Sequence, residues 1–200
     1  MILRTPRRLF AAGLVLAVAS AALLFVPDRG APAAAFDPMD DYCLVAPALP
    51  YDARSGLAVF DPRPLPAHAR CPVCGMYPAR FPRWAAQTIF RDGAVHFFDS
   101  PVNLHLFLAD VSRYNRAYES ADVVVSFVTD VEDGRWIEAG QAYYVHGSNA
   151  LGPMRGGNLP AFASREAAQR FAEARGGDVI GAAELTADLL RGFVHGGHHH

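Results

Sequence analysis

The chain has 200 residues, of which 52% are hydrophobic, so it can bury the core of one compact domain or of two very small ones. Its 18 basic residues stand against 20 acidic ones, and this mild acidity argues against nucleic acid as a partner. The three cysteines cannot all pair within one chain, so at least one thiol is buried, regenerated by a partner or held by a metal.

The N-terminus has the pattern of an export signal. Three arginines precede an uncharged apolar run over residues 9–26, and Ala33-Ala34-Ala35 forms an Ala-x-Ala cleavage site. The run is also long enough to span a bilayer, so cleavage and retention as a single membrane anchor both remain open. No cysteine directly follows the run, so no lipid-attachment site is expected. We therefore predict an exported, periplasmic protein in which residues 1–35 are a signal peptide or an inner-membrane anchor.

After this segment, residues 36–70 are rich in Pro, Ala and Asp and are predicted to form a tether. The ordered domain is predicted over residues 71–187. Its predicted elements are, in chain order, strands over 84–91 and 94–98, a helix over 102–108, strands over 122–130, 134–137 and 142–145, a helix that begins after Ser164, and a short strand over 178–180. Ser100 followed by proline, and Ser164, are the expected N-caps. Residues 188–200 are predicted to be a disordered His-rich tail.

A weak internal repeat relates the two halves of this domain. Phe98-Asp99-Ser100, with Phe107 after it, matches Phe162-Ala163-Ser164, with Phe171 after it, at a constant offset of 64 residues. In each half an aromatic residue ends a strand, a serine caps a helix and a second aromatic packs back. The predicted fold class is therefore α+β, with two small similar β-hairpin-plus-helix units, although so short a motif also arises by chance.

One motif carries most of the chemical information: Cys71-Pro72-Val73-Cys74-Gly75-Met76. A first interpretation is a thiol–disulfide redox protein that uses Cys71 and Cys74. Redox cysteines of that kind sit at a helix N-terminus, where the helix dipole lowers the thiol pKa. A glycine within the motif and two prolines soon after it make a helix unfavourable here.

The other two interpretations are metal sites. Zinc could be bound by His68 and both cysteines, with His96 or His105 as the fourth ligand, but a structural zinc site usually contains a second compact ligand pair. Cu(I) is a soft ion that binds thiolates and thioethers. Met154 lies in a loop too rich in Gly and Pro to be a core element, and such a loop can reach a shared cleft.

The copper interpretation rests on three soft donors. Cys74 and Met76 lie two residues apart, so in an extended segment both side chains project from the same face. A single methionine is more often a core residue, and a Cys-x-x-Cys pair is often a plain disulfide. Together the donors predict a Cu(I) site formed by Cys71, Cys74, Met76 and Met154. No catalytic constellation accompanies them, so no enzyme is predicted, and Asp99 is interpreted as an ordinary polar residue at a strand end.

The motif, together with Phe97-Phe98-Asp99, Gly152-Pro153-Met154 and Pro160-x-Phe162-x-Ser164, resembles the NosL family of nitrous oxide reductase accessory proteins over residues 68–187. The resemblance implies a periplasmic Cu(I) chaperone that supplies the copper–sulfur cluster of nitrous oxide reductase; for members with the longer motif, another copper protein is the alternative client. It also implies a fold of two similar α+β units.

Residue by residue, the resemblance maps the family's metal-binding Cys-x-Met onto Cys74 and Met76, and its distal methionine onto Met154. Cys71 matches members that carry the longer motif. Many members are lipoproteins, whereas this chain has a long apolar segment in place of the lipid-attachment cysteine. Membrane association through that segment is therefore an open alternative to cleavage.

Overall fold

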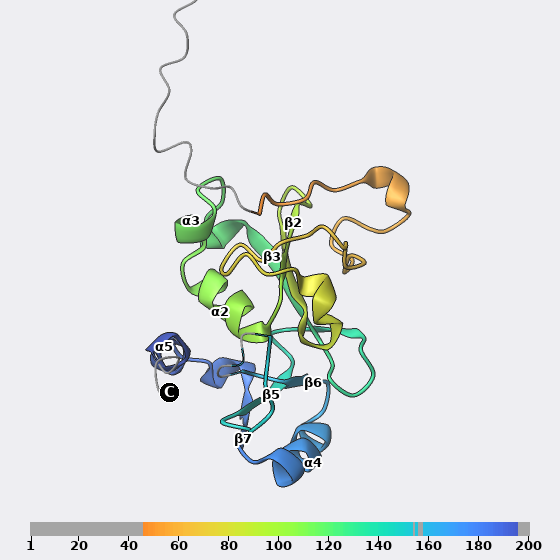
Figure 1. Ribbon diagram of the computed structural model, residues 1–200. Coiled ribbons are helices and arrows are strands. Elements are labelled where there is room, and N and C mark those ends of the chain that lie inside the picture. The colour runs from red at the N-terminus through yellow and green to blue at the C-terminus, as the bar shows by residue number, and fades with distance from the viewer. Residues whose placement is uncertain (1–45, 154, 156–157, 196–200) are drawn as a thin grey trace, which may run out of the picture. The chain divides into compact units, whose positions relative to one another are not determined.

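The structure is a computed structural model that describes residues 46–153, 155 and 158–195. Two antiparallel sheets organise this part of the chain. The first sheet has the order β2-β1-β3-β4 and contains β1 (Ala86–Phe90), β2 (Val95–Phe98), β3 (Val123–Thr129) and β4 (Trp136–Glu138). The second has the order β6-β5-β7 and contains β5 (Tyr143–His146), β6 (Ala161–Phe162) and β7 (Asp178–Gly181). The described helices are α2 (Pro101–Ala109), α3 (Val111–Tyr114), α4 (Arg165–Arg175) and α5 (Ala187–His195), which Figure 1 labels.

The two halves have the same connectivity. In the first, the hairpin β1-β2 leads through α2 to β3, and in the second, the hairpin β5-β6 leads through α4 to β7. In both halves the first strand lies between the other two and is antiparallel to each. The predicted α+β class and its two similar units are therefore confirmed. The halves differ most in their hairpin loops, which are short between β1 and β2 and long between β5 and β6.

Local capping signals set the start of both main helices. The Ser100 hydroxyl accepts a hydrogen bond from the Asn103 N–H at 3.3 Å, and Ser164 accepts one from the Ala167 N–H at 3.2 Å. Pro101 occupies the first turn of α2, where its missing N–H costs nothing. These caps confirm the predicted helix starts, and the first of them also fixes where Asp99, the residue before Ser100, must lie.

The junction between the halves is built around the buried Asp130. One carboxylate oxygen of Asp130 accepts a hydrogen bond from the Ala163 N–H at 3.0 Å, and the other accepts one from the Glu132 N–H at 2.8 Å. The backbone of Asp130 also forms a parallel bridge with Ala161 of β6. Because Ala163 precedes the cap of α4, one side chain fixes the second half against the end of β3.

The first sheet is covered on both faces. One face packs against α2 through buried aromatic and aliphatic side chains, among them Phe90, Phe98 and Phe107. The other face is covered by residues that the sequence analysis placed in the tether. Leu49 exchanges two backbone hydrogen bonds with Val95 of β2, at 2.8 and 2.9 Å, and its side chain joins the cluster on that face. The segment from residue 46 to 70 is therefore part of the folded domain, which corrects the prediction of a tether there.

A buried polar contact holds the same segment in place. The Gln87 side chain of β1 accepts a hydrogen bond from the Arg63 N–H at 2.8 Å and donates one to the Arg63 carbonyl at 3.1 Å. The Arg63 guanidinium donates to backbone carbonyls of residues 58, 59 and 61. None of these contacts has a periodic sequence signature, which is why the segment was predicted to be an irregular tether outside the folded domain.

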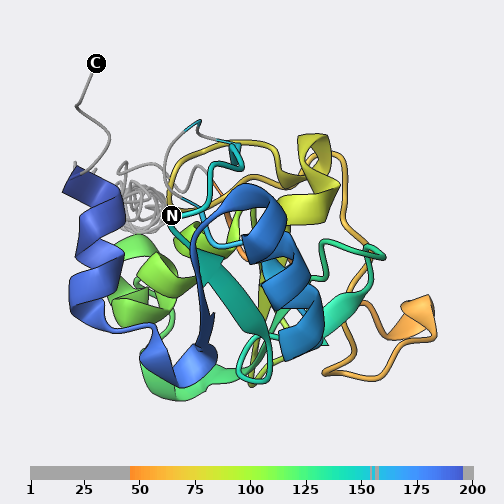
Figure 2. The same ribbon diagram turned by 90° about the horizontal axis from the view of Figure 1, so that it is seen from below.

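The C-terminal boundary also differs from the prediction. Residues 188–195, assigned to a disordered tail, belong to α5, which packs beside α2 in both Figure 1 and Figure 2. Leu190 of α5 is only 5% exposed. The sequence of α2 is apolar nearly all round because the sheet covers one side of this helix and α5 covers another. The rest of the His-rich tail, residues 196–200, lies outside the described residues.

Within the described ranges, no helix combines the length and the hydrophobicity that a membrane span requires. The apolar run at 9–26 and the cleavage site at 33–35 lie outside those ranges, as do Cys43 and residues 36–45 of the predicted tether.

Candidate metal centre

The Cys-x-x-Cys-Gly-Met motif folds into a closed turn in front of β1. The Cys71 N–H donates to the Met76 carbonyl at 2.8 Å, and the Gly75 N–H donates to the Cys71 carbonyl at 2.8 Å. Gly75 has φ 75°, a left-handed conformation that glycine adopts without steric cost. The segment is therefore not extended, and the premise that Cys74 and Met76 share one face of an extended chain is corrected. The turn brings the two cysteine side chains together instead.

A second element supplies polar side chains to this turn. Asp99 links β2 to the cap of α2, and Asn103 lies in the first turn of that helix. The Cys74 thiol donates to Asp99 Oδ1 at 3.3 Å. Asn103 Nδ2 donates to the same carboxylate oxygen at 2.7 Å and to the Cys74 sulfur at 3.3 Å. The thiol, the carboxylate and the amide thus form one connected network.

Three potential metal ligands converge in this network. The Sγ atoms of Cys71 and Cys74 and a carboxylate oxygen of Asp99 all lie within 4.8 Å of one another. Neither cysteine is in a disulfide. Asp99 is fully buried, and its Oδ2 has no hydrogen-bond partner among the described residues. A buried carboxylate oxygen without a partner is costly in a native protein, and a bound cation is one way to satisfy it.

The surroundings of Cys71 favour the protonated form of its thiol. Burial raises the pKa of Cys71 well above its ordinary value, and the neighbouring Cys74 and the charge of Asp99 raise it further. A cation placed between the three groups would lower the pKa of the Cys71 thiol again, because it stabilises each anionic ligand. Cys71 is fully buried and Cys74 is half-buried, so an incoming ion meets the Cys74 sulfur first.

The donor set limits which ions fit. Two thiolates suit Cu(I) and Zn(II), whereas a carboxylate oxygen by itself favours harder ions. Met76 ends the same turn and is half-buried, and its carbonyl accepts the hydrogen bond that closes the turn. A thioether ligand would tilt the site towards Cu(I), because thioethers bind Cu(I) but hardly bind zinc. Met154, the fourth predicted ligand, lies outside the described residues, in the loop between β5 and β6.

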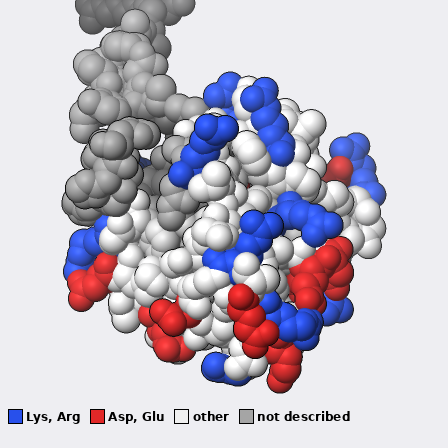
Figure 3. Space-filling view, turned by 60° about the horizontal axis from the view of Figure 1, so that its bottom comes forward, with Lys and Arg blue, Asp and Glu red and all other residues white. Residues whose placement is uncertain are grey.

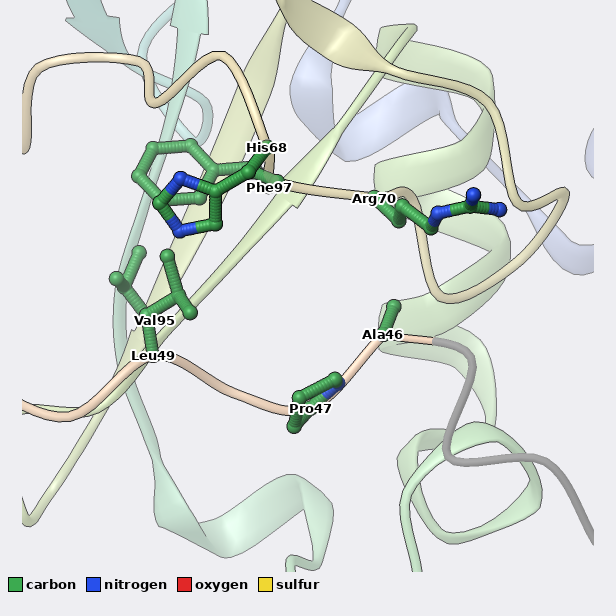
Figure 4. Close-up of a pocket in the computed structure, with 8 residues that line it drawn as sticks. Ala46, Pro47, Leu49, His68, Arg70, Val95 and Phe97 are labelled. Carbon is green, nitrogen blue, oxygen red and sulfur yellow. The ribbon is translucent and has the colours of Figure 1, made fainter.

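The histidines proposed for a zinc site lie elsewhere. Buried His96 accepts a hydrogen bond from the Asn115 amide at 2.9 Å, and burial lowers its pKa to about 4. His105 Nε2 lies 3.1 Å from the Tyr144 hydroxyl, and burial lowers its pKa to about 4 as well. The exposed His68 lines a cavity of about 190 Å³ with Leu49, Val95 and Phe97, shown in Figure 4. Within the described part of the chain, the ligand cluster at the cysteine turn contains no histidine.

Asp99 and Asn103 are the residues that the sequence analysis missed. Asp99 was interpreted as an ordinary polar residue because nothing in the spacing shows that a segment 25 residues earlier returns to it. The sequence did contain a signal. Asp99 follows the aromatic pair that ends β2 and directly precedes Ser100, the cap of α2, and an acidic residue placed between two buried elements is itself buried. The resemblance to the NosL family also included Phe97-Phe98-Asp99, without assigning Asp99 a role.

Comparisons with known proteins place the chain in a family. The NosL family model matches residues 62–190. The copper-binding lipoprotein NosL of Stutzerimonas stutzeri is 32% identical over 133 residues, which cover 64% of this chain and 70% of that protein. The copper-binding lipoprotein NosL of Achromobacter cycloclastes is 34% identical over 92 residues, which cover 40% of this chain and 48% of that protein.

A solved structure supports the same assignment. The crystal structure of the copper chaperone NosL from Shewanella denitrificans matches with a TM-score of 0.55 and 25% sequence identity, and the match covers 64% of this chain and 97% of that one. The resemblance read from the cysteine turn and the two helix caps is thereby confirmed, and the chain belongs to the NosL family.

Proposed function

We propose that this protein is a Cu(I)-binding metallochaperone and not an enzyme. The observation that carries the proposal is the cluster of Cys71, Cys74 and Asp99, in which two free thiols lie beside a buried carboxylate. The Oδ2 atom of that carboxylate has no hydrogen-bond partner among the described residues. Met76 and Met154 complete the proposed ligand set and supply the selectivity of thioethers for Cu(I). Relatives named as copper-binding proteins and as a copper chaperone support the choice of copper.

The geometry suits transfer more than permanent storage. The half-buried Cys74 offers the accessible sulfur, while the buried Cys71 gives up its proton only when the ion enters. A partner thiolate can therefore attack the ion from the Cys74 side, and when Cu(I) leaves, a proton returns to Cys71. The raised pKa of Cys71 favours this return, so the apo site is stable without the metal.

We further propose that the client is an exported copper enzyme, nitrous oxide reductase being the first candidate. The protein would act in the periplasm, held at the membrane by the apolar run at 9–26 if that run is not cleaved. Two relatives are named lipoproteins, which supports export and a position at the membrane.

The alternative function is thiol–disulfide exchange, because Cys71 and Cys74 are close enough to face each other. The thiolate is the reactive form of cysteine, and the raised pKa of Cys71 leaves little thiolate at neutral pH. The alternative therefore needs Cys74 to start every reaction.

The two functions separate in one experiment with two readouts. The Cu(I)-loaded protein is mixed with apo nitrous oxide reductase, and copper in the enzyme is measured after the two proteins are separated. The apo protein is assayed in parallel for catalysis of insulin disulfide reduction. A chaperone transfers copper, and the Cys74→Ser variant does not. Catalytic insulin reduction without copper transfer would favour the redox alternative.

A further inference from the structure

The charge around the cysteine turn is distributed unevenly along the chain. Residues 62–91 contain five arginines and no Asp or Glu, although the whole chain has more acidic than basic residues. Two of the five are held inside the fold or at its edge: Arg63 is buried, and the Arg91 guanidinium donates to the Ala121 carbonyl. The other three are exposed residues on either side of the turn, at positions 70, 80 and 83.

Two of these guanidinium groups are held by one aromatic ring. The Arg70 guanidinium lies 4.5 Å from the centre of the Tyr77 ring and donates to the Tyr77 hydroxyl, and the Arg80 guanidinium lies 5.1 Å from the same ring. Arg70 directly precedes Cys71, and Tyr77 directly follows Met76. Stacking on an aromatic ring orders an arginine while leaving N–H donors free. The first and last residues of the cysteine turn are therefore flanked by ordered positive charge.

These arginines have no carboxylate partner among the described residues. Arg54, Arg135 and Arg170, by contrast, each form an ion pair with an Asp or Glu. The third exposed arginine near the turn, Arg83, donates to a backbone oxygen, the Val131 carbonyl, at 2.6 Å. Two like charges held on one ring raise the local positive potential, which favours the approach of an anionic group.

The views of the molecule agree with this description. Residues 70–84, yellow, run along the upper edge in Figure 2, and Figure 3, turned the same way by a smaller angle, shows basic side chains at its upper edge with no acidic ones between them. Acidic side chains gather on the lower part of that view. Arg70 is one of the residues that line the cavity in Figure 4, where its guanidinium extends away from Leu49 and Phe97.

We propose that Arg70, Arg80 and Arg83 form a docking surface for an acidic patch on a protein that exchanges copper with this chain. The proposal rests on the proposed copper function, because it explains why the charges surround the turn through which the ion passes. Arginine binds carboxylates through two parallel hydrogen bonds, which adds orientation to attraction. Long-range attraction also raises the rate of encounter between oppositely charged surfaces. An anionic membrane is the competing partner, but a membrane pressed against the turn would block the path of the ion.

The test measures binding of a fluorescent ten-residue glutamate peptide to the full-length chain in a neutral detergent, by anisotropy at low ionic strength. The double variant Arg70→Gln/Arg80→Gln is expected to weaken binding at least fivefold. The matched control, Arg113→Gln/Arg165→Gln, removes two guanidiniums that stack on Tyr114 and Tyr143 instead. This control should leave the affinity within twofold, and Arg70→Lys/Arg80→Lys should retain part of it.

The outcomes are distinguishable from those that test copper binding. Equal weakening in both double variants would show that only net charge matters and would overturn the proposal. Binding to phosphatidylglycerol vesicles is measured with the same variants. If Arg70→Gln/Arg80→Gln binds the vesicles more weakly but binds the peptide as the unmodified chain does, the proposal is overturned in favour of a membrane surface. Cu(I) affinity is measured separately by chelator competition and should be unchanged in the Gln variant. If even the unmodified chain fails to bind Cu(I), the proposed function fails, whereas the docking surface is still judged by the peptide.

Discussion

Asp99→Asn is the substitution that best separates a metal ligand from a structural residue. The Asn side chain keeps the size of Asp99 and one acceptor oxygen for Asn103, which now donates to the carboxylate at 2.7 Å. It removes the negative charge and puts an amide nitrogen in place of the buried Oδ2, which has no hydrogen-bond partner among the described residues. The substitution therefore changes the chemistry of the cluster more than its packing.

The two effects on the apo protein nearly cancel. Replacing a charge-assisted hydrogen bond by a neutral one costs about 1 kcal/mol. Removing a buried charge lowers the desolvation cost by a comparable amount, while the amide nitrogen that replaces Oδ2 is as unpaired as the oxygen was. We expect the stability of the apo protein to change by no more than about 1 kcal/mol, or roughly 2–4 °C in Tm for a domain of this size. Loss of an anionic ligand should lower Cu(I) affinity about 10- to 100-fold, which is about 1.4–2.7 kcal/mol.

Thermal unfolding with and without Cu(I) measures both effects in one assay. A ligand that binds only the folded state stabilises it according to its affinity, so the copper-induced stabilisation should fall by about 1.4–2.7 kcal/mol in the variant. The control is Asp110→Asn, which also changes an Asp at a helix start, where Asn caps equally well. A variant that loses about 2 kcal/mol or more without copper, and keeps the full stabilisation with it, would refute the ligand role of Asp99.

Further predictions concern the thiols and the core. Cys74→Ser should lower Cu(I) affinity far more than Met76→Leu or Met154→Leu, because a thiolate is anionic and a thioether is neutral; equal losses in a chelator competition would contradict the ligand ranking. Because the pKa of Cys71 is raised, binding must release its proton, so Cu(I) affinity should fall as pH drops from 8 to 6, and a flat profile would argue against thiolate ligands. The same raised pKa predicts that the apo protein loses stability as pH rises above about 9, since the unfolded thiol then ionises while Cys71 stays protonated; urea midpoints between pH 7 and 10 test this. Phe90→Ala, at a fully buried position stacked on Tyr118, should destabilise the fold by about 3–5 kcal/mol in the same denaturation assay, whether or not copper is present.

The elements that the sequence predicted well are those with local causes. Ser100 and Ser164 begin helices because their hydroxyls cap the next turn, and the strands of both sheets follow hydrophobic runs bounded by turn residues. The two cysteines were found because Cys-x-x-Cys is a short-range motif whose turn depends on the following glycine.

What the sequence did not predict depends on contacts between distant segments. Leu49 is ordered by pairing with Val95, and this contact leaves no periodic signal in its own segment. The helix α5 is ordered by packing on α2; its apolar residues Leu189, Leu190 and Phe193 do follow helical spacing, but that signal is short and was not used. Asp99 becomes part of the cluster only because the turn at Cys71 folds back onto the start of α2. The sequence prediction placed Met76 on the same face as Cys74 by assuming an extended chain. The structure instead has a hydrogen-bonded turn from Cys71 to Met76, so that assumption was wrong.

The most direct test of the account is an anaerobic Cu(I) titration of the full-length chain in competition with a bathocuproine-type chelator, beside the variant in which Cys71 and Cys74 are both replaced by serine. The account predicts that the unmodified chain takes one Cu(I) from the chelator and that the double variant takes none. Copper retention by the double variant at the affinity of the unmodified chain would contradict it, because the ion would then be bound away from the turn that joins Cys71, Cys74 and Asp99.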